Sequence, residues 1–181
     1  MSGTVGDNVA RASGVIASAG GGGKIQQVVQ TYKTDVTTQA GSGSTTFYDI
    51  TGMSTAITPT KESSKILVDV CLVMGAGDFG TMKVQADIAG GGYNEIGRAD
   101  DASSRARGWT GQIYTTSGYQ CLPYHQKFLW TPSYTLTDVL TCKALWSMVS
   151  GTTVALNRSG SATNTNTHIV GTSSLTLWEI N

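Results

Sequence analysis

Three glycines and a later aspartate form the pattern in this sequence that comes nearest to a cofactor site. Gly75, Gly77 and Gly80 give the spacing G-x-G-x-x-G after an apolar segment, and Asp100 follows twenty residues after Gly80. In dinucleotide-binding proteins a helix begins within this pattern, and its first N–H groups hold the pyrophosphate. Residues 81–88 instead alternate apolar and polar side chains, which predicts a strand. We therefore interpret the pattern as a turn and expect no cofactor.

Other arrangements that could perform chemistry are weak. His125 and His168 lie in separate polar contexts, and no G-x-S-x-G elbow is present for a nucleophilic serine. The 12 acidic residues are scattered, without the paired carboxylates of a glycoside hydrolase or an Asp-x-Asp-x-Asp-Gly calcium loop. Cys71, Cys121 and Cys142 lack the C-x-x-C spacing of a zinc or redox site and fit synthesis in a reducing cytoplasm. We predict a protein that is not an enzyme and holds no metal.

The densest cluster of charge lies between residues 98 and 107 and is followed by aromatic side chains. Arg98, Asp100 and Asp101 are candidates for an exposed binding loop, and Trp109 and Tyr114 add flat rings that could contact a sugar or a protein. A solvated surface loop would carry the same charges. Aromatic residues in such a context more often belong to a core or a subunit interface, so both interpretations stay open.

The overall composition argues against several classes of protein. Lys and Arg number 12, Asp and Glu number 12, and charged residues make up only 13% of the 181 residues, so the formal net charge is zero. A face that binds nucleic acid, or a polybasic surface that binds membranes, requires an excess of positive charge. Every apolar run is far shorter than the roughly 20 residues that span a bilayer. We expect no nucleic-acid partner and no membrane insertion.

Short strands explain the apolar pattern after residue 23. Residues 64–74 are apolar on both parities, which predicts a central strand covered on each face. Further strands are expected at residues 25–32, 46–51, 54–58, 81–88, 112–115, 126–130, 134–148, 153–156 and 174–180. Turn residues separate these segments, and no window predicts a helix, so the pattern favours an antiparallel β-sandwich.

Residues 1–23 differ in composition from the rest of the chain. They contain no aromatic residue and include the run of four glycines at residues 20–23. Such a segment cannot bury enough apolar surface to offset the entropy of ordering it. We therefore predict a flexible N-terminal arm at residues 1–23 and one domain at residues 24–181.

Three segments, in order along the chain, resemble bacteriophage proteins. Residues 6–17, GDNVARASGVIA, are similar to a linker common in tail-fibre and virion proteins. Residues 57–68, ITPTKESSKILV, resemble the "ITP-x-x-x-SSKILV" signature of a phage domain family, and residues 173–180, SSLTLWEI, resemble its closing strand. The likeness covers nearly all of the predicted domain. It implies a virion protein, of a kind frequent in marine and cyanobacterial phages, with a tumour-necrosis-factor-like jelly roll that is usually a homotrimer.

The last predicted strand gives the trimer a candidate interface. Trp178 and Ile180 share a parity opposite Leu175 and Leu177, so this strand is apolar on both faces. A single small domain would expose one of those faces, whereas a trimer could bury it along the threefold axis. Trp178 and Ile180 are therefore the candidate trimer-interface residues.

The expected function is that of a capsid decoration, or cement, protein on the surface of the virion. Its partner would be the major capsid protein of the shell, contacted by the N-terminal arm. The residues of the arm expected to anchor it are Asp7, Asn8, Arg11, Val15 and Ile16. The alternative is a receptor-binding tip module of a tail fibre or spike, which would contact other tail proteins and recognise host surface glycans.

Overall fold

The computed structural model describes residues 24–76, 80–101, 103–110, 113–115, 119–148, 152–160 and 169–181, without the side chains of Ser44 and Ala76. The expected arm at residues 1–23, with its five candidate anchoring residues, lies outside the described residues. Within the described ranges the regular elements are β-strands, as the alternating pattern predicts. No helix in these ranges is long and apolar enough to cross a membrane.

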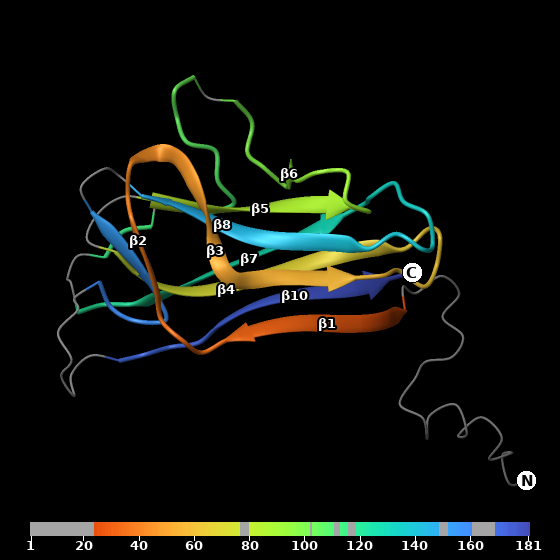
Figure 1. Cartoon of the computed structure of the whole chain (residues 1–181), viewed down its shortest axis with the longest axis horizontal. Helices are drawn as coiled ribbons and strands as arrows, with labels where there is room; N and C mark the ends of the chain where they lie inside the picture. The colour runs from red at the N-terminus through yellow and green to blue at the C-terminus, as the bar shows by residue number, and fades with distance from the viewer. Residues whose placement is uncertain are drawn as a thin grey trace, which may run out of the picture.

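Two antiparallel sheets make up the described part of the chain (Figure 1). Sheet A runs β1-β10-β4-β9-β2. The sixth strand, β7, lies off this path and pairs with residues 66–74 of β4, on the edge opposite β10. Its strands are β1 (Ile25–Lys33), β2 (Thr37–Ala40), β4 (Lys65–Ala76), β7 (Leu122–Trp130), β9 (Thr153–Leu156) and β10 (Ser173–Ile180). Sheet B runs β3-β8-β5-β6, with β3 (Gly43–Ile57), β5 (Gly80–Ile88), β6 (Asn94–Ile96) and β8 (Leu140–Met148). The two sheets pack against each other, so the fold is the predicted all-β antiparallel sandwich.

The core lies between the sheets and is built from alternate residues of the central strands. The inward residues of β4 and β8 are almost completely buried: Ile66, Val68, Val70, Leu72, Met74, Leu140, Cys142, Ala144, Trp146 and Met148. Removing each large apolar side chain from water contributes roughly 1.5–3 kcal/mol. In β8 the inward parity is the one that the sequence pattern assigns to the core. For β4 the pattern predicted cover on each face, but only one parity packs in the core, and Leu67, Asp69, Cys71 and Val73 on the other parity are half-buried.

One continuous strand, β3, replaces two predicted strands at residues 46–51 and 54–58. Its pairing register with β8 shifts between Asp49 and Ser54, and Gly52 in this interval has a φ of 80°. Glycine adopts a left-handed φ at little cost, so the strand continues through a bulge instead of ending.

Other differences involve short or polar segments. The strands β2 and β6 have four and three residues with mostly polar side chains, so alternation does not predict them. The predicted strand at residues 112–115 is reduced, in the described residues, to one bridge between Ile113 and Gly80. Asp138 interrupts the apolar pattern of the predicted strand at residues 134–148 because it lies in a turn, and β8 begins only at Leu140. In this turn its carboxylate accepts a hydrogen bond from the Thr135 amide at 2.8 Å.

Close backbone contacts explain two glycines of the G-x-G-x-x-G pattern. A Cβ atom on Gly75 would lie 2.6 Å from the Arg158 carbonyl oxygen, and one on Gly80 would lie 2.1 Å from that of Ser147. The segment after Gly80 is the strand β5, so the prediction of a strand in place of a nucleotide-binding helix is confirmed. Gly77 lies outside the described residues.

A buried carboxylate joins the two segments that resemble the phage signature. Glu179 of β10 is completely buried and accepts hydrogen bonds from the loop that connects β3 with β4. The Thr60 amide donates at 2.7 Å, the Lys61 amide at 3.1 Å and the Ser64 hydroxyl at 2.7 Å. Gln27 Nε2 of β1 donates to the other oxygen at 2.8 Å. The loop at residues 58–64 is thereby fastened to the last strand.

Candidate functional site

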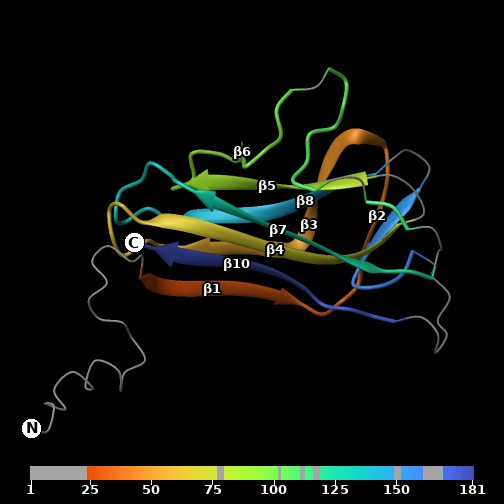
Figure 2. The same ribbon diagram turned by 180° about the vertical axis from the view of Figure 1, so that it is seen from behind.

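Sheet A presents one face to the core and an opposite face with no cover from the described residues. We call the second surface the outer A face. It is defined by the outward residues of four neighbouring strands: Ile25, Val28, Gln30 and Tyr32 of β1; Ser174, Thr176, Trp178 and Ile180 of β10; Lys65, Leu67, Asp69, Cys71 and Val73 of β4; and Pro123, His125, Lys127 and Leu129 of β7. Figure 2 shows these four strands side by side. The two predicted interface residues, Trp178 and Ile180, both belong to this face.

One end of the outer A face is apolar. Val28, Trp178, Leu67 and Leu129 are consecutive partners in the strand registers and form a row across β1, β10, β4 and β7. Val28 is 46% exposed and Leu129 is 47% exposed. The Trp178 indole N–H is buried without a hydrogen-bond partner in the described part of the chain. An unsatisfied donor of this kind costs about 1–3 kcal/mol, and a contiguous apolar patch typically marks an interaction surface.

The middle of the outer A face is polar but close to neutral. Asp69 accepts a hydrogen bond from Lys127 Nζ at 2.9 Å, and its other oxygen lies 2.6 Å from His125 Nε2. Gln30 Nε2 donates to the Thr176 hydroxyl at 2.8 Å. Because these groups satisfy one another within the chain, they could be covered by another surface with little loss of hydrogen bonding.

The three cysteines are free thiols. Cys71 lies in β4 of sheet A and Cys142 in β8 of sheet B, both as small packed side chains. Burial raises the pKa of Cys142 to about 12, so this thiol stays protonated. Burial, with a smaller effect of the Asp69 charge, also raises the pKa of Cys71. Neither is therefore an activated thiolate. No group of three or more His, Cys, Asp or Glu side chains within the described ranges could hold a metal ion.

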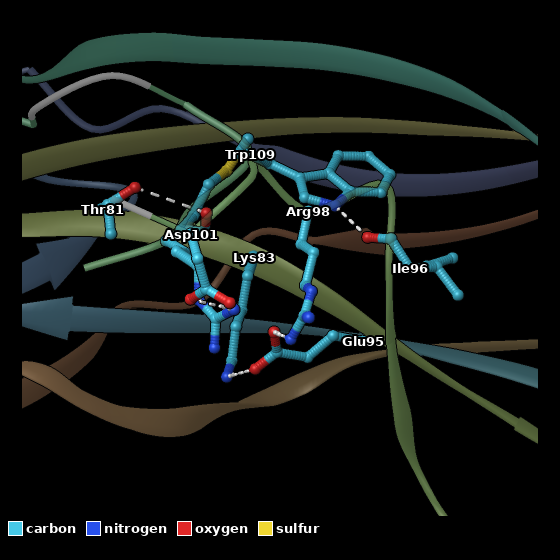
Figure 3. Close-up of polar contacts among 9 residues, drawn as sticks. Thr81, Lys83, Glu95, Ile96, Arg98, Asp101 and Trp109 are labelled. Atoms are coloured by element: carbon cyan, nitrogen blue, oxygen red, sulfur yellow. Dashed lines mark hydrogen bonds and ion pairs between the residues drawn. The ribbon is translucent and has the colours of Figure 1, made fainter. Parts of the chain in front are cut away.

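A second candidate surface lies on the opposite side of the sandwich, where residues 97–101 and 103–108, which we call the 97–108 loop, pass over the outer face of sheet B. Figure 1 shows this loop rising beyond β5 and β6, away from β1 and β10. Trp109 holds both ends of the loop: its indole N–H donates to the Ile96 carbonyl, and its amide donates to the Met82 carbonyl at 2.6 Å (Figure 3). The Thr81 hydroxyl donates to the Thr110 carbonyl at 2.9 Å.

Trp109 is therefore not an exposed binding residue, and that prediction is wrong. It is only 7% exposed and contacts Phe128 of β7 edge to face, with ring centroids 5.8 Å apart. Its ring fills the gap between β7 and sheet B, and its N–H finds a carbonyl, which is the usual arrangement for a buried indole. The other interpretation of this aromatic, as part of the core, is the one that agrees with its burial.

Glycines fix the close approach of the loop at both ends. A Cβ atom on Gly108 would lie 1.9 Å from the Thr81 hydroxyl oxygen, and one on Gly97 would lie 2.7 Å from the Phe128 ring. Gly97 also has a φ of 59°, which favours glycine. The loop thus lies directly against β5 of sheet B at Gly108 and against the Phe128 ring of β7 at Gly97, and larger residues would prevent either contact.

Ion pairs line the space between the loop and sheet B. Lys83 of β5 pairs with Glu95 of β6 (Figure 3). The Lys83 ammonium also lies 4.1 Å from the centre of the Phe47 ring. Arg98 lies 3.7 Å from Glu95, and Arg107 pairs with Asp101 at 2.6 Å. The hydrogen bond from Lys83 and the nearby positive charges hold the pKa of Glu95 below its usual value, despite partial burial. Glu95 is therefore a paired anion at neutral pH.

These groups surround a hollow of about 240 Å³, which we call the loop hollow. Strands β3, β5 and β6 line it from below, and residues 101 and 103–107 line it from above. Of the predicted binding-loop residues, Asp101 lines the loop hollow, Arg98 and Asp100 are exposed beside it, and Tyr114 is 44% exposed outside its lining. Lys83 was not predicted, because alternation shows only that it faces away from the core. Glu95 was not predicted, because the three-residue strand β6 that carries it has no alternating pattern.

The fold and these two surfaces define an all-β antiparallel sandwich with an apolar face on one sheet and a charged hollow on the other. No protein-family model matches the sequence, and no curated protein is significantly similar to it.

Proposed function

We propose that this chain is a structural protein of a bacteriophage virion, a homotrimeric capsid decoration protein without enzymatic activity. The observation that carries the proposal is the outer A face, where an apolar row crosses four strands and the Trp178 N–H lacks a partner among the described residues. Three copies that pack these faces around a threefold axis would bury the apolar row.

The resemblance to the phage signature supports the same proposal. Its two segments in the domain, residues 57–68 and 173–180, are distant in sequence, yet Glu179 binds one to the other through the hydrogen bonds described above. A buried carboxylate with this set of donors is a physical reason for the two segments to occur together. The arm at residues 1–23, with Asp7, Asn8, Arg11, Val15 and Ile16, would then attach the trimer to the major capsid protein.

Substitution of Leu129 by Glu tests the trimer. Leu129 is 47% exposed, so Leu129→Glu leaves the core intact, but in a trimer it would bury like charges at the interface. We expect the parent chain to have three times the mass of one chain by light scattering, and Leu129→Glu to be a folded monomer. The matched control is Leu136→Glu, in the turn before β8 and 41% exposed, which should remain trimeric. A monomeric parent chain, or a trimeric Leu129→Glu variant, would contradict the proposal.

The receptor-binding tip of a tail fibre or spike is the second candidate function. The loop hollow favours it, because a polar hollow on the side opposite the outer A face would point outward from such a trimer. Copy number distinguishes the two locations: many copies per virion, distributed over the shell, support the decoration protein, and a few copies at the tail support the fibre module.

A further inference from the structure

The loop hollow has a chemical character that the proposed structural role does not explain. Three cationic side chains line it, Lys83, Arg105 and Arg107, against two carboxylates, Glu95 and Asp101. Lys83 and Arg107 are paired with the two carboxylates. Arg105 is exposed and forms no hydrogen bond or ion pair with any residue that the structure describes. The lining therefore has one uncompensated positive charge.

Lys83 shows that the loop hollow is a formed site and not an open stretch of surface charge. This side chain is only 8% exposed, although it points away from the core. The 97–108 loop covers it, Glu95 accepts a hydrogen bond from its ammonium, and the Phe47 ring packs against that ammonium. Because these contacts fix Lys83 and Glu95 before any ligand binds, a ligand would lose little free energy to the ordering of these two side chains.

Hydroxyl groups complete the lining. Thr45 of β3 and Ser103 and Ser104 of the loop line the hollow. The carboxylates of Glu95 and Asp101 retain further acceptor sites, since each oxygen can accept more than one hydrogen bond. A ligand that suits these groups carries several hydroxyls of its own, which both donate and accept.

The volume and the charge restrict the ligand further. About 240 Å³ is smaller than the roughly 300–1,000 Å³ pockets that enclose drug-sized molecules, so the hollow suits a single ring. A phosphate group would bring up to two negative charges beside Glu95 and Asp101, with one uncompensated cation to balance them. A single carboxylate matches that one charge and fits the planar guanidinium of Arg105 in a bidentate pair.

We propose that the loop hollow binds one acidic sugar residue, with its carboxylate on Arg105 and its hydroxyls on the loop serines and the two lining carboxylates. This inference does not depend on the place of the chain in the virion. It would give either a decoration protein or a fibre module the ability to bind acidic glycans.

Titration of the full chain with glucuronate, followed by NMR, tests the proposal. We expect millimolar binding that shifts the amides of residues 103–107, and weaker binding of glucose, which has the same ring without the carboxylate. Arg105→Ala should weaken the binding of glucuronate by about tenfold, the effect of losing one charge-assisted pair. Lys61→Ala is the control, because it removes one positive charge from an exposed side chain that neither lines the hollow nor pairs with a lining residue.

Several outcomes would overturn the inference. These are no shift of residues 103–107 with glucuronate, equal affinity for glucose and glucuronate, or equal losses of glucuronate affinity in Arg105→Ala and Lys61→Ala. Tighter binding of inorganic phosphate than of glucuronate at the same residues would show a general anion site in place of a sugar site. The proposal of an acidic-sugar site would be supported if only Arg105→Ala weakens glucuronate binding and all variants bind glucose weakly.

Discussion

At the scale of single residues, Glu179 shows how a charge can be kept inside this sandwich. Burial alone would raise the pKa of its carboxyl, but hydrogen bonds from Ser64, Gln27 and Thr60 outweigh that effect and lower the pKa below the ordinary value of 4.5. The carboxylate therefore stays ionised and organises the loop at residues 58–64. A charged acceptor is well suited to this task because charge-assisted hydrogen bonds are stronger than neutral ones.

Replacing Glu179 by Gln should destabilise the fold in a pH-dependent way. We expect Glu179→Gln to lower the free energy of unfolding by about 1.5–3 kcal/mol at pH 7. The NH2 group of the new side chain would face the N–H and O–H donors of the loop, which then lose an acceptor. A carboxyl with a lowered pKa in the folded state stabilises it above the unfolded value near 4.5, and the effect disappears as pH falls through the folded value. The difference between parent and variant should therefore be constant above about pH 4.5 and shrink below it.

Urea unfolding at a fixed protein concentration, over a series of pH values, measures this difference. Glu62→Gln is the matched control, since Glu62 lies in the same loop with an exposed side chain. It should leave stability within about 0.5 kcal/mol of the parent, as is usual for surface substitutions. Equal effects of the two substitutions, or a gap that widens in acid, would refute the role assigned to Glu179.

The residues of β5 show how much of the burial could be predicted from sequence. Met82, Val84 and Ala86 alternate with polar residues, and all three are buried as the pattern requires. The pattern also places Lys83 on the outward parity, but it cannot show that Lys83 is covered. That burial results from a loop whose position depends on Trp109 meeting Phe128, and contacts between such distant residues leave no periodic signal.

At the scale of elements, the 97–108 loop depends on its glycines as much as on its ion pairs. Exposed charged pairs contribute about 0–1 kcal/mol each, so Arg107–Asp101 alone would hold the loop weakly. Its end at Gly108 instead lies against β5, where a Cβ atom would be 1.9 Å from the Thr81 hydroxyl oxygen and 2.8 Å from the Met82 carbonyl oxygen. Backbone contact at this point determines where the loop hollow can form.

Gly108→Ala should therefore displace the end of the loop. We expect faster hydrogen exchange for residues 103–110 and a loss of stability of about 1–3 kcal/mol, the usual cost of forcing an extra carbon into a packed position. Gly91→Ala provides the comparison, because Gly91 is exposed and its nearest contact, at 3.2 Å, is a single carbonyl oxygen of a turn. Unchanged exchange in Gly108→Ala would mean that the loop is held by other contacts.

Some strands could be predicted from the local sequence, whereas others depend on pairing with distant segments. The boundaries of β9 were predicted to the residue, and β10 begins one residue earlier than expected, because apolar alternation ends where the strand does. The short strand β6 has no such signal, since it exists through its pairing with β5 at Val84, Gln85 and Ala86. Glu95, which it carries into the loop hollow, was missed for that reason.

At the scale of the whole molecule, the two sides of the sandwich differ in chemistry. The outer A face combines an apolar row with Asp69, whose carboxylate contacts His125 and Lys127 within the chain. The side of sheet B carries the charged loop hollow. A chain with a net charge of zero has little electrostatic repulsion between copies. Such a distribution suits a protein that associates through one side and presents the other to its surroundings.

Deletion of residues 1–23 tests the remaining part of the proposed function, which is attachment to the shell. The trimer contacts proposed here all lie in residues 25–180, so the truncated chain should have the same mass in solution as the parent. Capsid occupancy should be lost, because three arms on one trimer act together and their combined affinity disappears with them. Occupancy is measured by quantifying the protein on purified virions assembled with the truncated chain.

A full-length variant separates the chemistry of the arm from its length. In this variant Asp7, Asn8, Arg11, Val15 and Ile16 are all replaced by Ser, so the arm keeps its reach and loses its candidate contacts. If those side chains bind the capsid protein, this variant should remain trimeric and show the same low occupancy as the deletion. Full occupancy of the deletion variant would refute attachment through the arm. Full occupancy of the serine variant alone would refute the five assigned residues, because attachment would then depend on other residues of the same arm.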